Sequence, residues 1–303
     1  MYDYPQLKKD IDNSGVSILE VSNTTKEYIR EMNKLSFKNM ISSTGSLYLN
    51  LIDGYDTTLV SKMIYKIVDI NKTMHVWHQF IGEGKKLTYK ASDHERLETT
   101  QLEKDGSISY TENYDQKAIV LWYISGSYEK LTILRKWLVD NYKTSIFQMW
   151  YEIELQTNPG QGGVVVTKIH QELTKIYLEL YKDLEEVQNF GREYNSDTTL
   201  AQTFRLQVYE EGCFISPHED GNDGQCSMLL YTNEDYVEGM GGELVCTDSR
   251  PGRKKEITVP PTIGTLVIVD FKSNPTHAVN AIKEKDWLRT TIGCWWPPGN
   301  IYN

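Results

Sequence analysis

From residue 203 to the end of the chain, apolar and polar residues alternate with a period of two. Gly, Pro, Asn and Asp residues divide this region into short segments, which read FRLQVY, CSMLLYT, GELVCT, KEITV, TLVIVDF, HAVNAI and RTTIGCWW. Such alternation predicts β-strands, because successive side chains of a strand point to opposite faces of the sheet. Many short strands separated by turns are typical of an antiparallel sandwich or barrel, and here they favour a jelly roll.

The part of the chain before residue 203 mixes helical and strand patterns. Apolar residues recur with helical spacing in the segments 25–40, 57–71, 128–142 and 164–189, and Leu59, Met63, Ile64 and Ile67 form one stripe of the second. The segment 118–125 is typical of a buried strand, and the polar segment 82–116 is expected to form loops or short edge strands. In 145–155, apolar residues alternate with Gln148, Glu152 and Glu154, which predicts a half-buried strand.

Together these patterns predict an α+β protein, in which a double-stranded β-helix (jelly-roll) core is supported by N-terminal helices. Residues 1–144 are expected to form a helical and mixed region that packs on the core. Residues 145–303 are expected to form the jelly-roll domain, with a supporting helix at about 164–189 lying against its sheet.

Charge and cysteine content limit the expected partners. The 42 acidic residues outnumber the 32 basic ones and give a net charge of −10, so nucleic acid is not an expected partner. The N-terminus lacks a basic start with an apolar run, and no stretch is long and apolar enough to span a bilayer, so no membrane partner is expected. The cysteines lie mostly in apolar runs without a C-x-x-C pair, which favours buried free thiols and a cytoplasmic location. They are Cys213, Cys226, Cys246 and Cys294.

A histidine and an aspartate stand two residues apart in SPHEDGNDGQC, as His218 and Asp220. The pair alone is weak evidence for a metal site, because a solvated acidic turn can contain the same residues. A second imidazole, His277 in NPTHAVNAI, follows the predicted strand TLVIVDF and therefore comes from a distant part of the same sheet. Two histidines and one carboxylate form the facial triad that binds non-heme Fe(II) and leaves positions open for substrate. The sequence therefore predicts an iron site.

An arginine follows the second histidine on the last predicted strand, DWLRTTIGCWW. Strand alternation places Arg289, Thr291 and Gly293 on one face. A buried guanidinium needs an anion, because an unpaired buried charge costs about 3 to 5 kcal/mol. A planar, permanently charged donor suits the far end of a dicarboxylate, and we expect that anion to be the C5 carboxylate of 2-oxoglutarate.

In this order, the motifs resemble those of the Fe(II)/2-oxoglutarate-dependent dioxygenase superfamily, and within it the prolyl hydroxylase-like group. The resemblance covers about residues 205–296 and is carried by LQVYEEGCFISPHEDG, MLLYTNEDYVEGMGGEL, GTLVIVDFKSNPTHAVNAI and RTTIGCWW. It implies Fe(II), 2-oxoglutarate and O2, with ascorbate as reductant. The residues that it implies at the iron are His218, Asp220 and His277. Those that it implies at 2-oxoglutarate are Arg289, Tyr231, Tyr209 and Thr291.

The resemblance implies hydroxylation of an unactivated C–H bond, and it leaves the substrate open. In this superfamily N-terminal additions usually select the substrate, so residues 1–144 are expected to do so here. Arg205 and Gln207 share the face of Tyr209 and are candidate substrate contacts. Arg205 either binds a substrate carboxylate, which favours a small amino acid or related metabolite, or forms an ordinary salt bridge with an acid.

Two alternatives remain. Peptidyl-prolyl hydroxylation of a protein is favoured by the local resemblance. A non-catalytic jelly-roll binding module, or a metal protein without a cosubstrate, would have no use for Arg289 and Thr291 on one inward face. The sequence does not indicate an oligomeric state.

Overall fold

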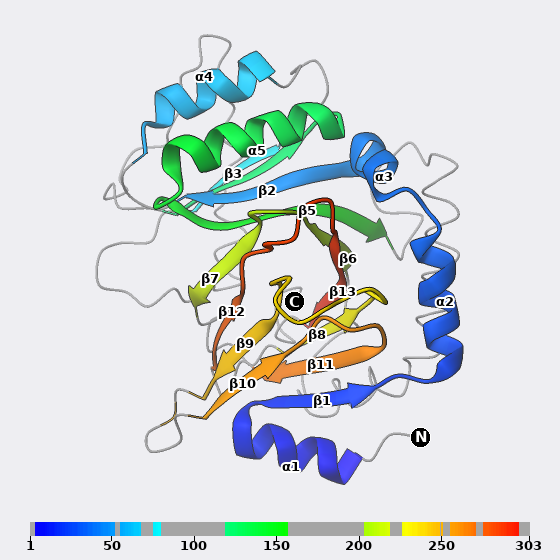
Figure 1. Cartoon of the computed structure of the whole chain (residues 1–303). Helices are drawn as coiled ribbons and strands as arrows, with labels where there is room; N and C mark the ends of the chain where they lie inside the picture. Colours follow the sequence, from blue (N-terminus) through cyan, green and yellow to red (C-terminus); the bar gives the residue numbers. More distant parts are fainter. Residues whose placement is uncertain are drawn as a thin grey trace, which may run out of the picture.

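The computed structural model describes residues 4–51, 55–67, 75–79, 119–156, 203–218, 226–248, 250, 255–270 and 275–296. Thirteen strands of this part of the chain form one strongly curved sheet (Figure 1). They are β1 (Val16–Glu20), β2 (Gly45–Leu51), β3 (His75–Gln79), β4 (Ile119–Ser125), β5 (Ile146–Gln156), β6 (Thr203–Tyr209), β7 (Phe214–His218), β8 (Cys226–Tyr231), β9 (Leu244–Thr247), β10 (Glu256–Val259), β11 (Thr265–Asp270), β12 (Thr276–Val279) and β13 (Arg289–Trp296).

The order of the strands is that of a jelly roll. One half of the sheet runs β1-β11-β8-β13-β6-β5 and then turns through β7 into β12-β9-β10, with antiparallel pairing throughout. The two halves face each other (Figure 1). The predicted jelly-roll core is therefore confirmed, and each of the seven apolar segments found after residue 203 contains one of its strands.

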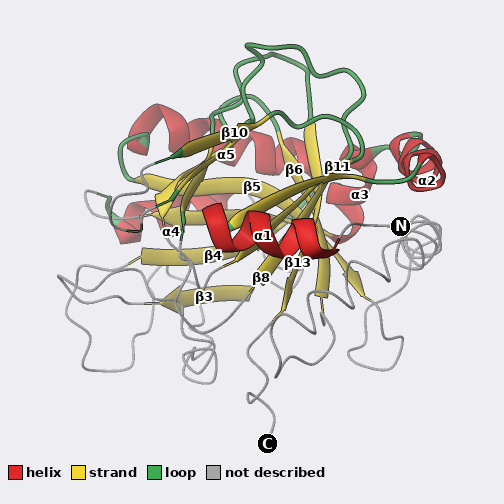
Figure 2. Ribbon diagram, turned by 90° about the horizontal axis from the view of Figure 1, so that it is seen from below, coloured by secondary structure: helices red, strands yellow, loops and turns green. Residues whose placement is uncertain are grey.

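The helices of the N-terminal region support this sheet. They are α1 (Tyr4–Ser14), α2 (Asn23–Asn33), α3 (Phe37–Thr44), α4 (Thr57–Ile67) and α5 (Tyr128–Tyr142). The first helix packs against β1 and β11 (Figure 2), whereas α3 and α5 pack against β5 and α4 packs on α5. No helix in the described ranges is long and apolar enough to cross a membrane.

Two helix predictions need correction. The segment 25–40 forms two helices, because Ser36 has an extended backbone and its hydroxyl caps the second helix by accepting a hydrogen bond from the Asn39 N–H. On α4, Leu59 is 44% exposed, whereas Val60 and Ile64 are buried. The buried stripe therefore includes Val60 in place of Leu59, on a helix that packs against α5.

The strand predicted at 145–155 is also different from expectation. β5 is an interior strand between β2 and β6, and residues 145–153 are all buried. One face of β5 packs beneath α3 and α5, and the other face carries Gln148 and Glu152 into the space between the two halves of the sheet. The polar residues of β5 therefore line the interior of the barrel, and the prediction of a half-buried strand was wrong.

Strands from the first half of the chain extend the same sheet. β1 pairs with β11 at one end of the strand order, and β2 joins the sheet beside β5, so residues before 145 contribute strands to the same sheet. The boundary between residues 144 and 145 stays a prediction. The helix expected at 164–189 and the loops expected at 82–116 lie outside the described residues. Cys213 and Cys246 are buried free thiols, as expected.

Candidate active site

The two predicted histidine ligands lie on adjacent strands. His218 ends β7 and is the cross-strand partner of His277 near the start of β12. Their ring centroids are 4.3 Å apart. A β-bulge separates this pair from the neighbouring pair of Ile215 with Val279. Antiparallel pairing therefore brings together two imidazoles that are far apart in the sequence.

Both imidazoles are oriented through the same ring nitrogen. Nδ1 of His218 donates to the Ser216 carbonyl at 2.9 Å, and Nδ1 of His277 donates to the Pro275 carbonyl at 3.2 Å. A neutral imidazole that is protonated at Nδ1 keeps its lone pair at Nε2. Metal-binding histidines usually have such a backbone partner, which fixes the ring and its tautomer. Both Nε2 atoms are therefore suited to bind one metal ion.

The third predicted ligand, Asp220, lies outside the described residues. Among the residues that are described, no group of three His, Cys, Asp or Glu side chains could hold a metal ion. The place of Asp220 in the iron site therefore stays a prediction from the sequence.

Arg289 occupies the interior of the barrel and is only 1% exposed. Its Nε donates to the Gly242 carbonyl at 2.8 Å, and its guanidinium lies 4.4 Å from the centre of the Tyr209 ring and 5.1 Å from that of Tyr231. Gly242 has a φ of +82°, and a Cβ atom there would come within 2.8 Å of Arg289 Cδ. The second glycine of the Gly-Gly segment is thus required for the position of the arginine.

Three buried polar atoms around Arg289 have no hydrogen-bond partner among the described residues. They are Arg289 Nη1, Tyr231 Oη and Thr291 Oγ1. Thr291 is the cross-strand partner of Tyr231 on one side and of Gln207 on the other, so these side chains share a face. Buried polar groups are nearly always hydrogen-bonded, so this cluster of one cation and two hydroxyls is suited to a bound carboxylate. The residues fit the C5 carboxylate of 2-oxoglutarate.

The tyrosines of this cluster are held in their neutral form. Burial raises the pKa of Tyr231 to about 12, although the neighbouring Arg289 charge acts in the opposite direction. Burial likewise raises the pKa of Tyr209, whose hydroxyl donates to Gln207 Oε1 at 3.3 Å. Tyr209 Oη is therefore already engaged, whereas Tyr231 Oη is the hydroxyl that remains for the cosubstrate.

Arg205 lies next to an acid. Its Nη1 is 3.1 Å from Oε1 of Glu152 on the neighbouring strand β5, and the Glu152 side chain is only 6% exposed. Glu152 also accepts a hydrogen bond from Trp150 Nε1 at 3.1 Å. Of the two alternatives for Arg205, the salt bridge with an acid is the arrangement observed; contact with a substrate stays a prediction, as it does for Gln207.

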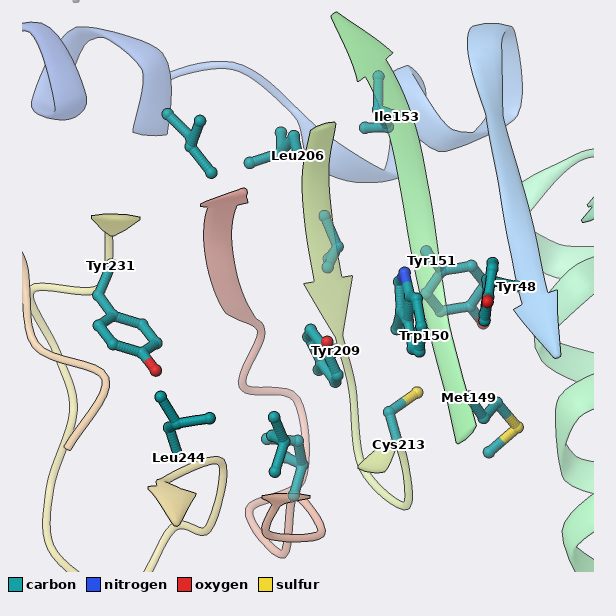
Figure 3. Packing of buried hydrophobic residues seen from close by; sticks show 14 of the residues in the cluster. Tyr48, Met149, Trp150, Tyr151, Ile153, Leu206, Tyr209, Cys213, Tyr231 and Leu244 are labelled. Atoms are coloured by element: carbon teal, nitrogen blue, oxygen red, sulfur yellow. The ribbon is translucent and has the colours of Figure 1, made fainter. Parts of the chain in front are cut away.

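The sequence pattern did not single out Asn50 and Gln148, two polar residues that lie near His218. Gln148 Nε2 lies 3.3 Å from His218 Nε2, and Gln148 Oε1 accepts a hydrogen bond from Asn50 Nδ2 at 2.7 Å. Next to them, the Trp150 ring stacks between those of Tyr48 and Tyr209 (Figure 3), with centroid distances of 3.9 and 5.9 Å. A signal was available in the sequence: Trp150 stands between Gln148 and Glu152 on the face that was expected to be polar.

Comparison with known proteins identifies the carboxyl-terminal segment. The sequence model of the 2OG-Fe(II) oxygenase superfamily matches residues 204–297. This segment includes β6 to β13, the two histidines and the cluster around Arg289. The search of curated proteins gave no match.

The solved structures that the comparison found include prolyl hydroxylases. A Pseudomonas putida prolyl-4-hydroxylase is 18% identical over 49% of this chain and 72% of its own, with a TM-score of 0.33. A Trichoplax adhaerens prolyl hydroxylase, solved with a hypoxia inducible factor peptide, is 10% identical over 97% and 89%, with a TM-score of 0.42. AviO1 from Streptomyces viridochromogenes is 9% identical over 100% and 98%, with a TM-score of 0.43.

Proposed function

Since the chain carries a 2OG-Fe(II) oxygenase domain at residues 204–297, we propose that it hydroxylates an unactivated C–H bond of a small amino acid or a related metabolite. The observation that carries the cosubstrate assignment is the buried cluster of Arg289 Nη1, Tyr231 Oη and Thr291 Oγ1, whose hydrogen-bonding capacity is unused by the described residues. In a binding module that takes no cosubstrate, these three buried polar groups would stay without hydrogen-bond partners, which is unfavourable.

The roles of the residues follow from their positions. His218 and His277 would hold Fe(II) through Nε2, with Asp220 as the carboxylate ligand. Arg289 would bind the C5 carboxylate of 2-oxoglutarate, with Tyr231 and Thr291 donating to the same carboxylate. When Fe(II), 2-oxoglutarate and O2 are bound together, they supply the oxidising power to convert C–H to C–OH, with succinate and CO2 as products. The protein fixes the geometry of the reactants and keeps water away from them.

The choice of a small substrate rests on the polar inner wall that β5 and β6 form. Arg205 and Glu152 place opposite charges side by side there, which suits the carboxylate and ammonium groups of an amino acid.

Peptidyl-prolyl hydroxylation is the second candidate and is favoured by the motif resemblance at 205–296. Ascorbate is the proposed reductant, and the buried thiols of Cys213 and Cys246 favour the cytoplasm as location.

The test is 2-oxoglutarate turnover. The full chain with Fe(II), ascorbate and O2 is expected to form succinate, and an Arg289→Met variant is expected to do so only at much higher 2-oxoglutarate concentrations. Pooled amino acids and proline-containing peptides are then searched by mass for the gain of one oxygen atom. An amino acid as sole product supports the proposal, and a peptide as sole product supports the second candidate. Complete absence of succinate with every pool favours the binding module.

A further inference from the structure

Asn50 and Gln148 form a buried amide pair beside the candidate iron ligand His218. They are cross-strand partners on β2 and β5 and are 4% and 7% exposed. Asn50 Nδ2 donates to Gln148 Oε1 at 2.7 Å, and Gln148 Nε2 lies 3.3 Å from His218 Nε2. The amide pair therefore ends at the histidine nitrogen that is suited to bind a metal. Neither amide belongs to the segment that matches the oxygenase superfamily.

With iron bound at His218, one N–H of Gln148 and the Oδ1 atom of Asn50 would each lack a hydrogen-bond partner among the described residues. A metal at His218 Nε2 takes the lone pair to which the Gln148 amide points, so that N–H then needs another acceptor. Asn50 Oδ1 is buried without a hydrogen-bond donor from any described residue. A buried polar group without a partner costs about 1 to 3 kcal/mol. One donor and one acceptor therefore remain on this inner wall of the barrel.

A planar amide can satisfy both groups at once, with one atom for each. Its carbonyl oxygen accepts from Gln148, and its N–H donates to Asn50 Oδ1. A carboxylate would leave Asn50 Oδ1 without a donor, and an ammonium would leave the Gln148 N–H without an acceptor. We propose that Asn50 and Gln148 recognise an amide group of the substrate beside the iron. This proposal rests on the proposed function, because it takes His218 as an iron ligand.

The experiment uses the full chain loaded with Mn(II) and 2-oxoglutarate, which reports binding without turnover. The probes are N-methylacetamide and methyl acetate, an ester of similar shape that lacks the N–H. Paramagnetic broadening of the probe methyl signals in NMR spectra measures how much of each probe lies close to Mn(II). We expect N-methylacetamide to bind about threefold to tenfold more tightly than the ester, as the one additional hydrogen bond allows. Equal broadening of both probes overturns the proposal.

The variants Gln148→Met and Asn50→Leu remove one amide each and nearly keep the side-chain volume. Asn50→Leu is expected to lose the preference for amide over ester, whereas Gln148→Met removes the donor to the carbonyl that both probes share and is expected to weaken the binding of both. In both variants Mn(II) affinity is expected to change less than about threefold. Thr132→Val is the matched control, because Thr132 on α5 contacts Tyr151 of β5 at 3.1 Å on the opposite face of the sheet. The control is expected to keep the preference. Asn50→Val, a smaller β-branched side chain that also lacks the Oδ1 acceptor, replaces Asn50→Leu if the latter does not fold.

The outcomes separate this proposal from the proposed function. A preference that survives in Asn50→Leu, or unchanged binding of both probes to Gln148→Met, overturns the role of the amide pair, whatever the protein catalyses. If wild-type protein forms no succinate with Fe(II) but retains the amide preference near Mn(II), the proposed reaction fails and the amide site stands. Acetamide serves as a third probe, because the amide could belong to a peptide bond or to the primary amide of a small molecule. Stronger binding of N-methylacetamide than of acetamide indicates a peptide group, and the reverse indicates the primary amide of a small molecule.

Discussion

Gly242 is expected to control the affinity for 2-oxoglutarate although none of its own atoms is expected to bind it. A Cβ atom at Gly242 would lie 2.8 Å from Arg289 Cδ and 2.7 Å from Ile282 Cδ1. To restore ordinary contact, Arg289 must retreat by at least about 0.6 Å, which moves its guanidinium relative to Tyr231 and Thr291. The substitution Gly242→Ala therefore displaces the group that we assign to the C5 carboxylate.

The size of the effect follows from these distances. Displacements approaching 1 Å in a positioned site can cost about 100-fold in activity, so we expect the KM for 2-oxoglutarate to rise about tenfold to 100-fold. The backbone also has a φ of +82° at this position, which costs a residue with a side chain about 1 to 2 kcal/mol. Overpacking against Ile282 and Arg289 adds about 1 to 3 kcal/mol, so the free energy of unfolding also falls.

Gly239→Ala separates the displacement of Arg289 from the cost of the backbone. Gly239 has a φ of +99°, and a Cβ atom there would meet nothing within 4 Å. Both variants are assayed for succinate formation at varied 2-oxoglutarate and for unfolding in denaturant. Gly239→Ala is expected to lose about 1 to 2 kcal/mol of stability with an unchanged KM. If both variants raise the KM equally, or neither does, the argument that Gly242 positions Arg289 is wrong.

Three further outcomes are expected. Arg289→Met should weaken 2-oxoglutarate binding about 100-fold or more, at unchanged Mn(II) affinity, since a charged partner of a buried carboxylate is worth about 3 kcal/mol or more; a change below tenfold would contradict this role. His277→Ala, or removal of metal with a chelator, should abolish succinate formation, and only the chelated wild type should recover with Fe(II). The raised pKa of Tyr231, about 12 against an ordinary 10, means that its stabilising contribution is complete below pH 10 and is lost as the pH rises towards 12. Tyr231→Phe should therefore flatten the loss of stability between these pH values, and an unchanged slope in alkaline unfolding curves would refute it.

Local patterns were enough to predict most of the strands. Period-two alternation and turn residues located the strands after residue 203, because each short strand buries one face and reverses at a turn. The helix 128–142 was predicted with its observed bounds. The pattern failed at β5, where alternation was taken as a sign of solvent on one side. Both faces of β5 are buried, since one packs beneath helices and the other faces the barrel interior.

The sequence by itself determined which chemistry is available. His218 and His277 offer imidazoles, and the burial expected for Arg289 required an anion, because these properties belong to the residue types and their strands. Only the tertiary structure decided which groups meet. Strand register placed His218 against His277 and Thr291 against Tyr231, and it brought Gln148 and Asn50 to the same place from strands outside the oxygenase segment. Pairing between distant strands is set by the closure of the whole sheet, which no local stretch of sequence specifies.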